Sequence, residues 1–308
     1  MINVNNVSKK FDNFYALNDV SCSIPKGAIY GMVGSNGAGK STFLRLISGV
    51  YKADGGSILI DEESVYNNPL AKCKTVFLSD DLYFLPGASL KRMSAFYKSI
   101  YPKYDEKKFE RLVKLFKLSS TKPIQSFSKG MKRQAAIILA LSSCPEYMML
   151  DETFDGLDPV MRSLVKKLIC EEVCENKATA ILTSHSLREL EDTCDQLALL
   201  HKGGLIFESD IQGIKTSLFK VQVAFAEKYD RTKFDGLEMD VRNFSQKGSV
   251  ANLIIRGDKE IIESQVKSLK PLILDILPLT LEEVFTYEME VYGYSFNEVL
   301  EGIENEKQ

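Results

Sequence analysis

The sequence has no excess of positive charge and no long hydrophobic run. It contains 39 lysines and arginines against 42 aspartates and glutamates, a formal net charge of −3. This balance offers no basic surface for DNA, RNA or an anionic membrane, so we expect no nucleic-acid partner. The longest apolar stretch, residues 135–141, is far shorter than the roughly 20 residues that span a bilayer. Because the first residues also lack a secretory signal, we expect a soluble, cytoplasmic protein.

Metal-binding spacings of cysteine are absent as well. None of the six cysteines forms a CxxC pair. Cys170 and Cys174 are four residues apart on a predicted helix and could hold a metal ion together with Cys194. We favour the alternative, in which the cysteines are small buried hydrophobic residues in a reducing compartment. The chain has only two histidines, and we assign no function to His201, which lies in a predicted hairpin.

The most informative segment is a glycine-rich loop near the N-terminus. It runs Gly34-Ser35-Asn36-Gly37-Ala38-Gly39-Lys40-Ser41-Thr42. It matches the G-x-x-x-x-G-K-[ST] pattern of phosphate-binding loops. An apolar, β-favouring stretch at 29–33 precedes it, and helical periodicity begins at residue 41. Backbone N–H groups and a helix N-terminus attract phosphate in such a turn, so the loop predicts a nucleoside triphosphate site rather than a chance match.

Two side chains of this loop have distinct expected roles. Lys40 supplies a positive charge to the β- and γ-phosphates, and Ser41 supplies a hydroxyl to Mg²⁺. The glycines at positions 34, 37 and 39 let the backbone approach the phosphate oxygens without a Cβ clash. We therefore expect ATP and Mg²⁺ as ligands.

The length indicates about two domains. The first, residues 1–212, is predicted to be α/β with a helical insert at about 82–140. Alternating or apolar runs predict its strands at 2–4, 20–24, 29–33, 57–61, 74–78, 147–151 and 178–183. Helical periodicity predicts helices within 89–141 and at 160–176 and 186–194, and a hairpin is predicted around residues 203–204.

The second domain, residues 213–308, is predicted to be a small α+β unit. Strands are expected at 219–225 and on either side of 245–249, and an amphipathic helix at 258–269. Thr280 and Glu283 fit a capping box that begins a helix with Leu281, Val284 and Phe285 facing inward. The polar residues 301–308 are expected to be loose.

An apolar strand at 147–150 leads into two acidic residues, Asp151 and Glu152. Strand alternation would send the two carboxylates to different faces, so they could serve different purposes. Asp151 suits Mg²⁺ binding, and Glu152 suits activation of the attacking water. The alternative, two solvated acids at a strand end, is weakened by the phosphate-binding loop about a hundred residues earlier.

Four further segments make residues 1 to about 215 resemble the nucleotide-binding subunits of ATP-binding cassette (ABC) transporters. Ser126–Gln134 resembles the signature segment of that family, and Asp155–Pro159 resembles its dimer-facing loop. Thr183-Ser184-His185 resembles the segment of its switch histidine, and Lys10–Leu17 its adenine-stacking segment. The resemblance implies a P-loop cassette with a mixed sheet, helices and a helical subdomain, followed by the small α+β domain.

The resemblance also implies roles for individual residues. Phe11 would stack on adenine, although Tyr15 is a rival and core packing of Phe11 is an alternative. Ser128 and Gly130 would bind ATP from the opposite copy, and Ser128 could also cap its helix. Asp158 would belong to the same nucleotide-binding interface. His185 would contact the γ-phosphate and hold the geometry of the attacking water.

Two departures from the family pattern bear on activity. Lys129 replaces the first of two signature glycines, which leaves Ser128 and Gly130 in place. The glutamine expected after the strand at 74–78 is replaced by Ser79-Asp80-Asp81. Asp80 could still bind Mg²⁺, but its negative charge near phosphate predicts altered turnover or coupling.

The resemblance implies two ATPase copies, identical or different, that close around two ATP molecules and drive a separate integral membrane permease. The chain would then lie on the inner face of the cell membrane. The C-terminal domain resembles those of bacterial exporters of antibiotics and peptides. A soluble cassette ATPase of translation or DNA repair is the alternative. The sequence lacks the Asn-Lys-x-Asp motif with which a GTPase binds guanine. Assignment as a P-loop kinase would leave the signature segment and His185 unexplained.

Overall fold

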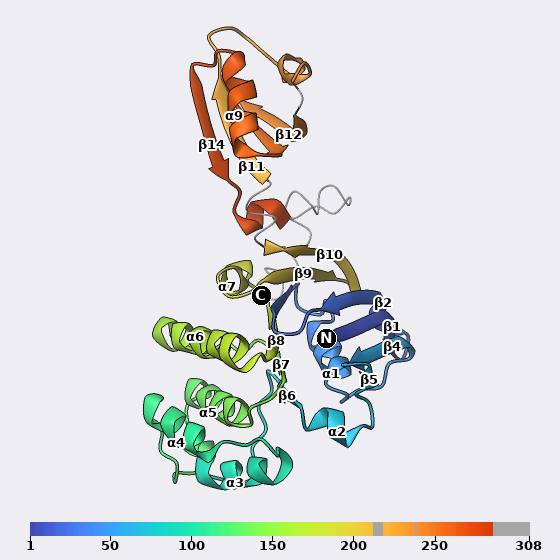
Figure 1. The fold of residues 1–308 in the computed structure, drawn as a ribbon, viewed down its shortest axis with the longest axis vertical. Helices are drawn as coiled ribbons and strands as arrows, with labels where there is room; N and C mark the ends of the chain where they lie inside the picture. Colours follow the sequence, from blue (N-terminus) through green and yellow to red (C-terminus); the bar gives the residue numbers. More distant parts are fainter. Residues whose placement is uncertain (212–217, 238, 286–308) are drawn as a thin grey trace. The chain divides into compact units, whose positions relative to one another are not determined.

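The computed structural model describes residues 1–211, 218–237 and 239–285 (Figure 1). Its internal contacts form two compact units, which divide between Glu208 and Ser209. The boundary predicted after residue 212 and the loose tail predicted at 301–308 lie outside the described residues.

A six-stranded sheet forms the centre of the first unit, in the order β10-β9-β3-β8-β7-β6. Strands β3, β6, β7, β8 and β9 pair in parallel. β3 and β7 are buried along their whole length, which is typical of parallel strands covered on both faces. The strands are β3 (Ile29–Val33), β6 (Thr75–Leu78), β7 (Tyr147–Leu150), β8 (Thr179–Ser184), β9 (Gln196–His201) and β10 (Gly204–Asp210).

A second, antiparallel sheet has the order β2-β1-β4-β5. Its strands are β1 (Ile2–Phe11), β2 (Phe14–Ile24), β4 (Gly55–Ile60) and β5 (Glu63–Ser64). β1 and β2 are longer than the predicted strands, because register shifts between Val4 and Lys10 interrupt the alternation that marks a strand in the sequence. Helix α1 (Lys40–Ile47) inserts Phe43 and Leu44 into the core that this sheet shares with β3 and β7.

The predicted helices of the first unit are confirmed. They are α3 (Leu90–Ile100), α4 (Glu106–Leu115), α5 (Lys129–Ser142), α6 (Pro159–Asn176) and α7 (Leu187–Glu191), with the unpredicted α2 (Pro69–Lys72) and the 3₁₀ turn η1 (Ile124–Ser126). The side chains of Ser89, Asp105 and Ser128 cap α3, α4 and α5 by accepting backbone N–H bonds. Figure 1 shows α3, α4 and α5 grouped together beside α6. In the part of the chain that the structure describes, no helix has the length and apolar character required to cross a membrane.

The second unit contains a four-stranded antiparallel sheet in the order β12-β13-β11-β14. Its elements are β11 (Leu218–Ala224), η2 (Arg231–Phe234), β12 (Asp240–Lys247), β13 (Val250–Arg256), α9 (Lys259–Ser268) and β14 (Ile273–Pro278). The sequence missed β14. The predicted capping box is present, because Thr280 N–H donates to Glu283 and Glu283 N–H donates to the Thr280 hydroxyl. Leu281, Val284 and Phe285 are buried, as expected.

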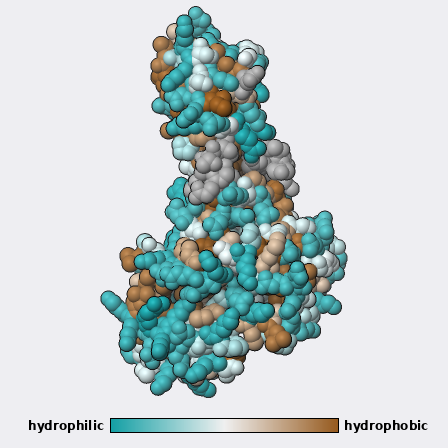
Figure 2. Space-filling view, viewed as in Figure 1, coloured by the Kyte–Doolittle hydropathy of each residue, from teal (hydrophilic) through white to brown (hydrophobic). Residues whose placement is uncertain are grey.

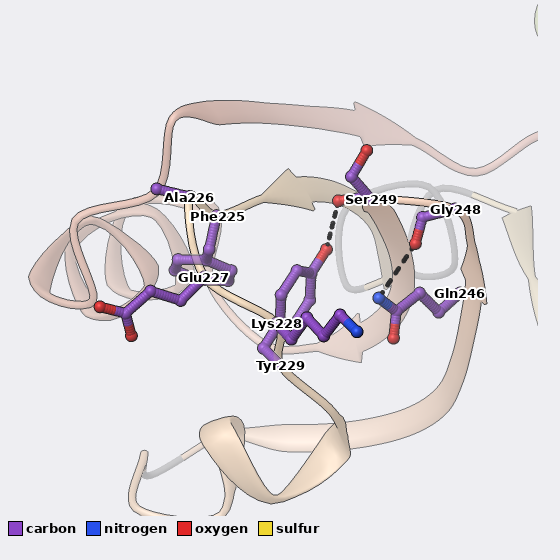
Figure 3. A pocket seen from close by; sticks show the side chains of 8 residues that line it. All are labelled: Phe225, Ala226, Glu227, Lys228, Tyr229, Gln246, Gly248 and Ser249. Carbon is purple, nitrogen blue, oxygen red and sulfur yellow. Dashed lines mark hydrogen bonds between the residues drawn. The ribbon is translucent and has the colours of Figure 1, made fainter.

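This unit has a cavity of about 410 Å³ beside the loop that follows β11 (Figure 3). The Tyr229 hydroxyl oxygen lies 2.8 Å from the carbonyl oxygens of both Val223 and Ser249, either of which can accept its one proton, and so ties this loop to the β12–β13 hairpin. None of the lining residues belongs to the predicted ATP site. They are Phe225, Ala226, Glu227, Lys228, Tyr229, Gln246, Gly248 and Ser249.

A buried ion pair joins the helical insert to α6. Lys108 of α4 contacts the carboxylate of Glu172, and both side chains are less than a tenth exposed. Asn176 donates a second hydrogen bond to Glu172 at 3.0 Å. Because a buried charge without its partner is costly, this pair constrains how α4 lies against α6.

We expect the substitution Lys108→Met to destabilise the protein by about 3–5 kcal/mol, because it leaves the Glu172 carboxylate buried without its cation. The double variant Lys108→Met/Glu172→Met should recover most of that loss. Urea unfolding followed by circular dichroism measures both, and Lys107→Met, at an exposed neighbouring lysine, is the control. Equal losses in the single and double variants would contradict this expectation.

Candidate active site

The carboxyl ends of β3, β7 and β8 meet at one edge of the parallel sheet. The strand register places Val33 beside Ser184 and Leu150 beside Leu182. The glycine-rich loop, the two acidic residues and His185 each follow one of these strands and therefore start side by side. Ligands of open α/β sheets bind at this edge.

The glycine-rich loop connects β3 directly to α1, as predicted. Gly39 precedes the helix with φ +109°, and a Cβ there would lie 2.5 Å from the carbonyl oxygen of Ala16. A Cβ on Gly34 would lie 2.3 Å from the carbonyl oxygen of Leu200. These two glycines are therefore required by packing against the chain itself, whereas Gly37 faces open space.

The remaining residues of the loop lie around the N-terminus of α1. Ser35 accepts a hydrogen bond from Ala38 N–H, and Asn36 is exposed. Ser41 and Thr42 belong to the first turn of the helix, next to the unpaired N–H groups that attract anions.

Lys40 is largely buried, at 6% exposure, and its ammonium group stays within the loop. Its Nζ donates to the carbonyl oxygens of Gly34 at 2.7 Å and Ser35 at 3.2 Å. The same atom lies 3.5 Å from a carboxylate oxygen of Glu152. The loop and the acidic pair are thus in direct electrostatic contact.

Asp151 is fully buried, which excludes a solvated strand end for this residue. Its Oδ1 accepts a hydrogen bond from the Thr183 hydroxyl at 2.7 Å, and its Oδ2 has no hydrogen-bond partner. An unpaired buried carboxylate oxygen is costly unless a cation or donor meets it. A hard oxygen donor of this kind fits Mg²⁺.

Glu152 differs from Asp151 for a reason that the sequence did not indicate. β7 ends at Leu150, so strand alternation does not separate the two acids. Instead Glu152 has a left-handed backbone, with φ +42°, a conformation that costs a non-glycine residue roughly 1–2 kcal/mol. Its N–H donates to the Thr183 hydroxyl at 3.1 Å.

The turned backbone places the Glu152 carboxylate between two nitrogen groups. One oxygen faces Lys40, and the other lies 3.0 Å from His185 Nδ1. His185 is about half exposed, and Glu152 is 16% exposed. A carboxylate held by a lysine and a histidine at the border of solvent can accept a proton from water.

The sequence did not assign a role to Thr183. Its single hydroxyl donates to Asp151 and accepts from Glu152 N–H, so it fixes both acids at once. Its position at the carboxyl end of β8, two residues before His185, was the available signal.

The signature segment contacts the turn that follows Glu152 in the same chain. Lys129 Nζ lies 2.7 Å from Asp155, and a Cβ on Gly130 would lie 2.8 Å from the carbonyl oxygen of Gly156. Ser128 caps α5 by accepting Met131 N–H, and Asp158 caps α6 in the same way. Ser128 and Asp158 are both exposed.

The two candidate adenine-stacking residues are both exposed, Phe11 at 41% and Tyr15 at 49%, which excludes core packing of Phe11. Phe11 meets Tyr51 edge to face, with ring centroids 5.5 Å apart. Tyr15 directly precedes Ala16, whose carbonyl faces Gly39 of the loop. The geometry keeps both residues as candidates.

Asp80 follows β6, and its carboxylate is paired with an arginine. Arg133 Nη2 donates to Asp80 Oδ1 at 2.6 Å, and Nη1 donates to the Ser79 carbonyl at 3.2 Å. The structure thus places this predicted Mg²⁺ ligand in contact with Arg133, in the part of the signature segment that lies on α5.

The six cysteines differ in burial. The expectation of buried residues is confirmed for Cys22 and Cys194 and is wrong for Cys174, which is exposed. The other three, Cys73, Cys144 and Cys170, are half-buried. Burial raises the pKa of Cys22 to about 12 and raises that of Cys194 as well, so these two thiols stay protonated at neutral pH. In the described ranges, no three histidine, cysteine or acidic residues are grouped to hold a metal, Cys170, Cys174 and Cys194 included.

We expect the substitution Thr183→Val to destabilise the protein by about 1–3 kcal/mol, because it leaves a buried carboxylate and an N–H group unpaired. Thr183→Ser, which keeps the hydroxyl, should lose less. Urea unfolding measures the stability of both variants. A loss in Thr183→Ser as large as the loss in Thr183→Val would contradict the expectation, because the hydroxyl would then stabilise the protein no more than the methyl group does.

Comparisons with known proteins agree with this geometry. The sequence profile of a family described as "ABC transporter" matches residues 17–155. A solved structure described as the ATP-binding subunit of an ABC transporter superposes with a TM-score of 0.65 at 25% identity, covering 70% of this chain and 92% of that chain. A dimeric ATP-binding cassette solved with ADP and Pi has a TM-score of 0.63 at 22% identity, covering 69% and 100%, and shows the fold alone. The predicted cassette fold is confirmed.

Curated relatives extend the match. The lantibiotic transport ATP-binding protein SrtF of Streptococcus pyogenes is 28% identical over 74% of this chain and all of its own length. The sulfate/thiosulfate import ATP-binding protein CysA 2 of Agrobacterium fabrum is 32% identical over 67% of this chain and 62% of its own. The ABC transporter ATP-binding protein YtrB of Bacillus subtilis is 32% identical over 92% of this chain and 97% of its own. The chain therefore belongs to the ABC transporter family, as an ATP-binding subunit with ATPase activity.

Proposed function

We propose that this ATPase works as a pair of copies that close around ATP and drive a separate membrane permease, which exports peptide- or antibiotic-type substrates. The observation that carries the proposal is the Glu152 carboxylate held between Lys40 of the phosphate-binding loop and His185. It provides a base at the position where a γ-phosphate bound by the loop would meet water.

In this mechanism the loop amides, the N-terminus of α1 and Lys40 bind the phosphates of ATP. Glu152 orients the attacking water and accepts its proton, while His185 holds the Glu152 carboxylate in place and contacts the γ-phosphate. The Thr183 hydroxyl keeps the backbone of Glu152 and the carboxylate of Asp151 in fixed positions. Phe11 or Tyr15 stacks on the adenine ring.

We propose that Ser41 and Asp151 hold Mg²⁺. The support is the unpaired, buried Oδ2 of Asp151 and the hydroxyl of Ser41 in the first turn of α1. When bound, the ion neutralises charge on the phosphate oxygens.

The second copy would complete the site through Ser128, Gly130 and Asp158. Exposure of Ser128 and Asp158 leaves them accessible to another chain, and the N-terminus of α5 is suited to a phosphate. Loss of the γ-phosphate on hydrolysis would remove the anion shared by the two copies, so the pair would open. This cycle of closing and opening is the work step.

We expect Glu152→Gln to bind ATP and form a stable dimer, while turnover falls about 10²–10⁴-fold because the base is lost. Light scattering with ATP measures the dimer, and phosphate release measures turnover. Glu175→Gln, at an exposed glutamate of α6, is the control and should behave like the native protein. Normal hydrolysis by Glu152→Gln would assign the base to another residue.

The permease would contact the helical insert. Tyr83 is 77% exposed, and Phe96 and Ile100 of α3 are also exposed. Figure 2 shows a mainly hydrophilic surface with hydrophobic residues in small separate groups. The chain would lie on the cytoplasmic side of the membrane through this contact.

Support for antibiotic-type substrates comes from the lantibiotic transport named for SrtF, whose whole length is matched. The sulfate import named for CysA 2 involves a shorter share of that protein. These relatives include an importer, so the choice of export is tested directly in the vesicle experiment below.

We expect a membrane-spanning subunit to co-purify with the full chain. The variant Tyr83→Ser should no longer co-purify with this subunit, whereas the control Leu277→Ser, on β14, should. Inside-out vesicles that carry both subunits should take up a labelled cationic peptide with ATP, because uptake in this orientation corresponds to export. Uptake only by right-side-out vesicles would indicate import. A native chain that purifies with no membrane protein would favour the soluble cassette ATPase.

A further inference from the structure

Four charged side chains of alternating sign connect three segments around the active site. Arg133 of α5 pairs with Asp80 at 2.6 Å, and Lys129, the first residue of α5, pairs with Asp155 at 2.7 Å. We call these four residues the signature charge network.

The Asp80–Arg133 pair has one buried and one accessible partner. The Arg133 side chain is 1% exposed, whereas that of Asp80 is 53% exposed. The guanidinium also donates to the carbonyl oxygen of Ser79, and its Nε has no hydrogen-bond partner. The buried cation therefore depends on Asp80, while the carboxylate of Asp80 would be hydrated without Arg133.

The two pairs also influence each other. The hydrogen bond from Lys129 is the main cause that lowers the pKa of Asp155, and the charge of Arg133 lowers it further. The hydrogen bond to Asp155 is likewise the main cause that raises the pKa of Lys129, and Asp80 adds to it. The four charges thus form one alternating group rather than two independent pairs.

The network holds the signature segment against the turn that carries Glu152. Asp155 N–H donates to the Glu152 carbonyl at 3.1 Å. The Lys129 stem passes over Gly156, where an added Cβ would lie 3.6 Å from the lysine Cδ. On the other side, Asp151 N–H donates to Leu78, two residues before Asp80.

We infer that Asp80 is a positioning residue that acts through Arg133, and that the signature charge network fixes the signature segment relative to Glu152. The inference rests on the proposed function for its effect on turnover. Arg133 neutralises the negative charge that Asp80 would otherwise bring close to phosphate. Asp80 thereby contributes to the placement of Ser128 and Gly130 rather than to Mg²⁺ binding.

The first experiment measures backbone protection without nucleotide. Hydrogen exchange of residues 126–133 and 153–158 is compared in native protein, Asp80→Asn, Asp80→Glu and the control Asp81→Asn. Loss of protection in both segments of Asp80→Asn, recovery in Asp80→Glu and no change in Asp81→Asn are expected. Unchanged exchange in Asp80→Asn would overturn the inference, whether or not the protein forms a dimer with ATP.

The second experiment separates positioning from metal binding. Asp80→Asn should raise KM for ATP about tenfold, within the usual range of coupling between sites, and leave the Mg²⁺ concentration for half-maximal activity unchanged. Asp80→Asn/Arg133→Met should recover part of this loss, because no buried cation remains unpaired. A higher Mg²⁺ requirement in Asp80→Asn, with no effect of Arg133→Met, would instead make Asp80 a metal ligand.

A third measurement distinguishes failure of this inference from failure of the proposed function. In the Glu152→Gln background, addition of Asp80→Asn should weaken ATP-dependent dimerisation, and Asp81→Asn should not. If Glu152→Gln alone forms no dimer with ATP, the proposed function fails, and the exchange experiment still decides the network. If Glu152→Gln forms a dimer that Asp80→Asn leaves unchanged, the network does not position the signature segment.

Discussion

The parallel pairing of β3, β8 and β7 is the constraint on which the rest of the site depends. Its register sets Val33 beside Ser184 and Leu150 beside Leu182, so that three loops leave the sheet together. A shift of one residue in a strand would turn its side chains to the opposite face. Because β3 and β7 are buried on both faces, such a shift would exchange the side chains packed on the two sides of the sheet and disrupt the packing of both. Burial of the sheet thus protects the geometry of the site.

Burial then distinguishes the two acidic residues of the site. Asp151 is fully buried, and only a group that reaches its Oδ2 atom, which has no hydrogen-bond partner, can interact with it. Glu152 has turned out of the strand direction and reaches the border of solvent, where a water molecule can approach. Two adjacent carboxylates thereby obtain different environments from one backbone torsion and one threonine hydroxyl. The partly strained conformation of Glu152 is consistent with a functional role.

Much of this organisation could be predicted because it depends on local sequence. The glycine-rich loop, the apolar strands and the capping box at Thr280 are short patterns whose physical meaning does not require distant residues. By contrast, bulges in β1 obscured its length, and the edge strand β14 was missed. The partnership of Asp80 with Arg133 was also invisible, because 53 positions separate two residues that meet only after α5 has packed beside β6.

The sequence alone determined the class of the protein, the phosphate-binding loop and the position of the acidic pair after an apolar strand, since each follows from residue types at fixed spacings. Only the tertiary structure decided how those residues are held. It replaced strand alternation by a left-handed Glu152, gave Thr183 its two hydrogen bonds, and paired Asp80 with a buried arginine. The physical reason is that hydrogen bonds and ion pairs between distant segments depend on packing, which no local pattern encodes.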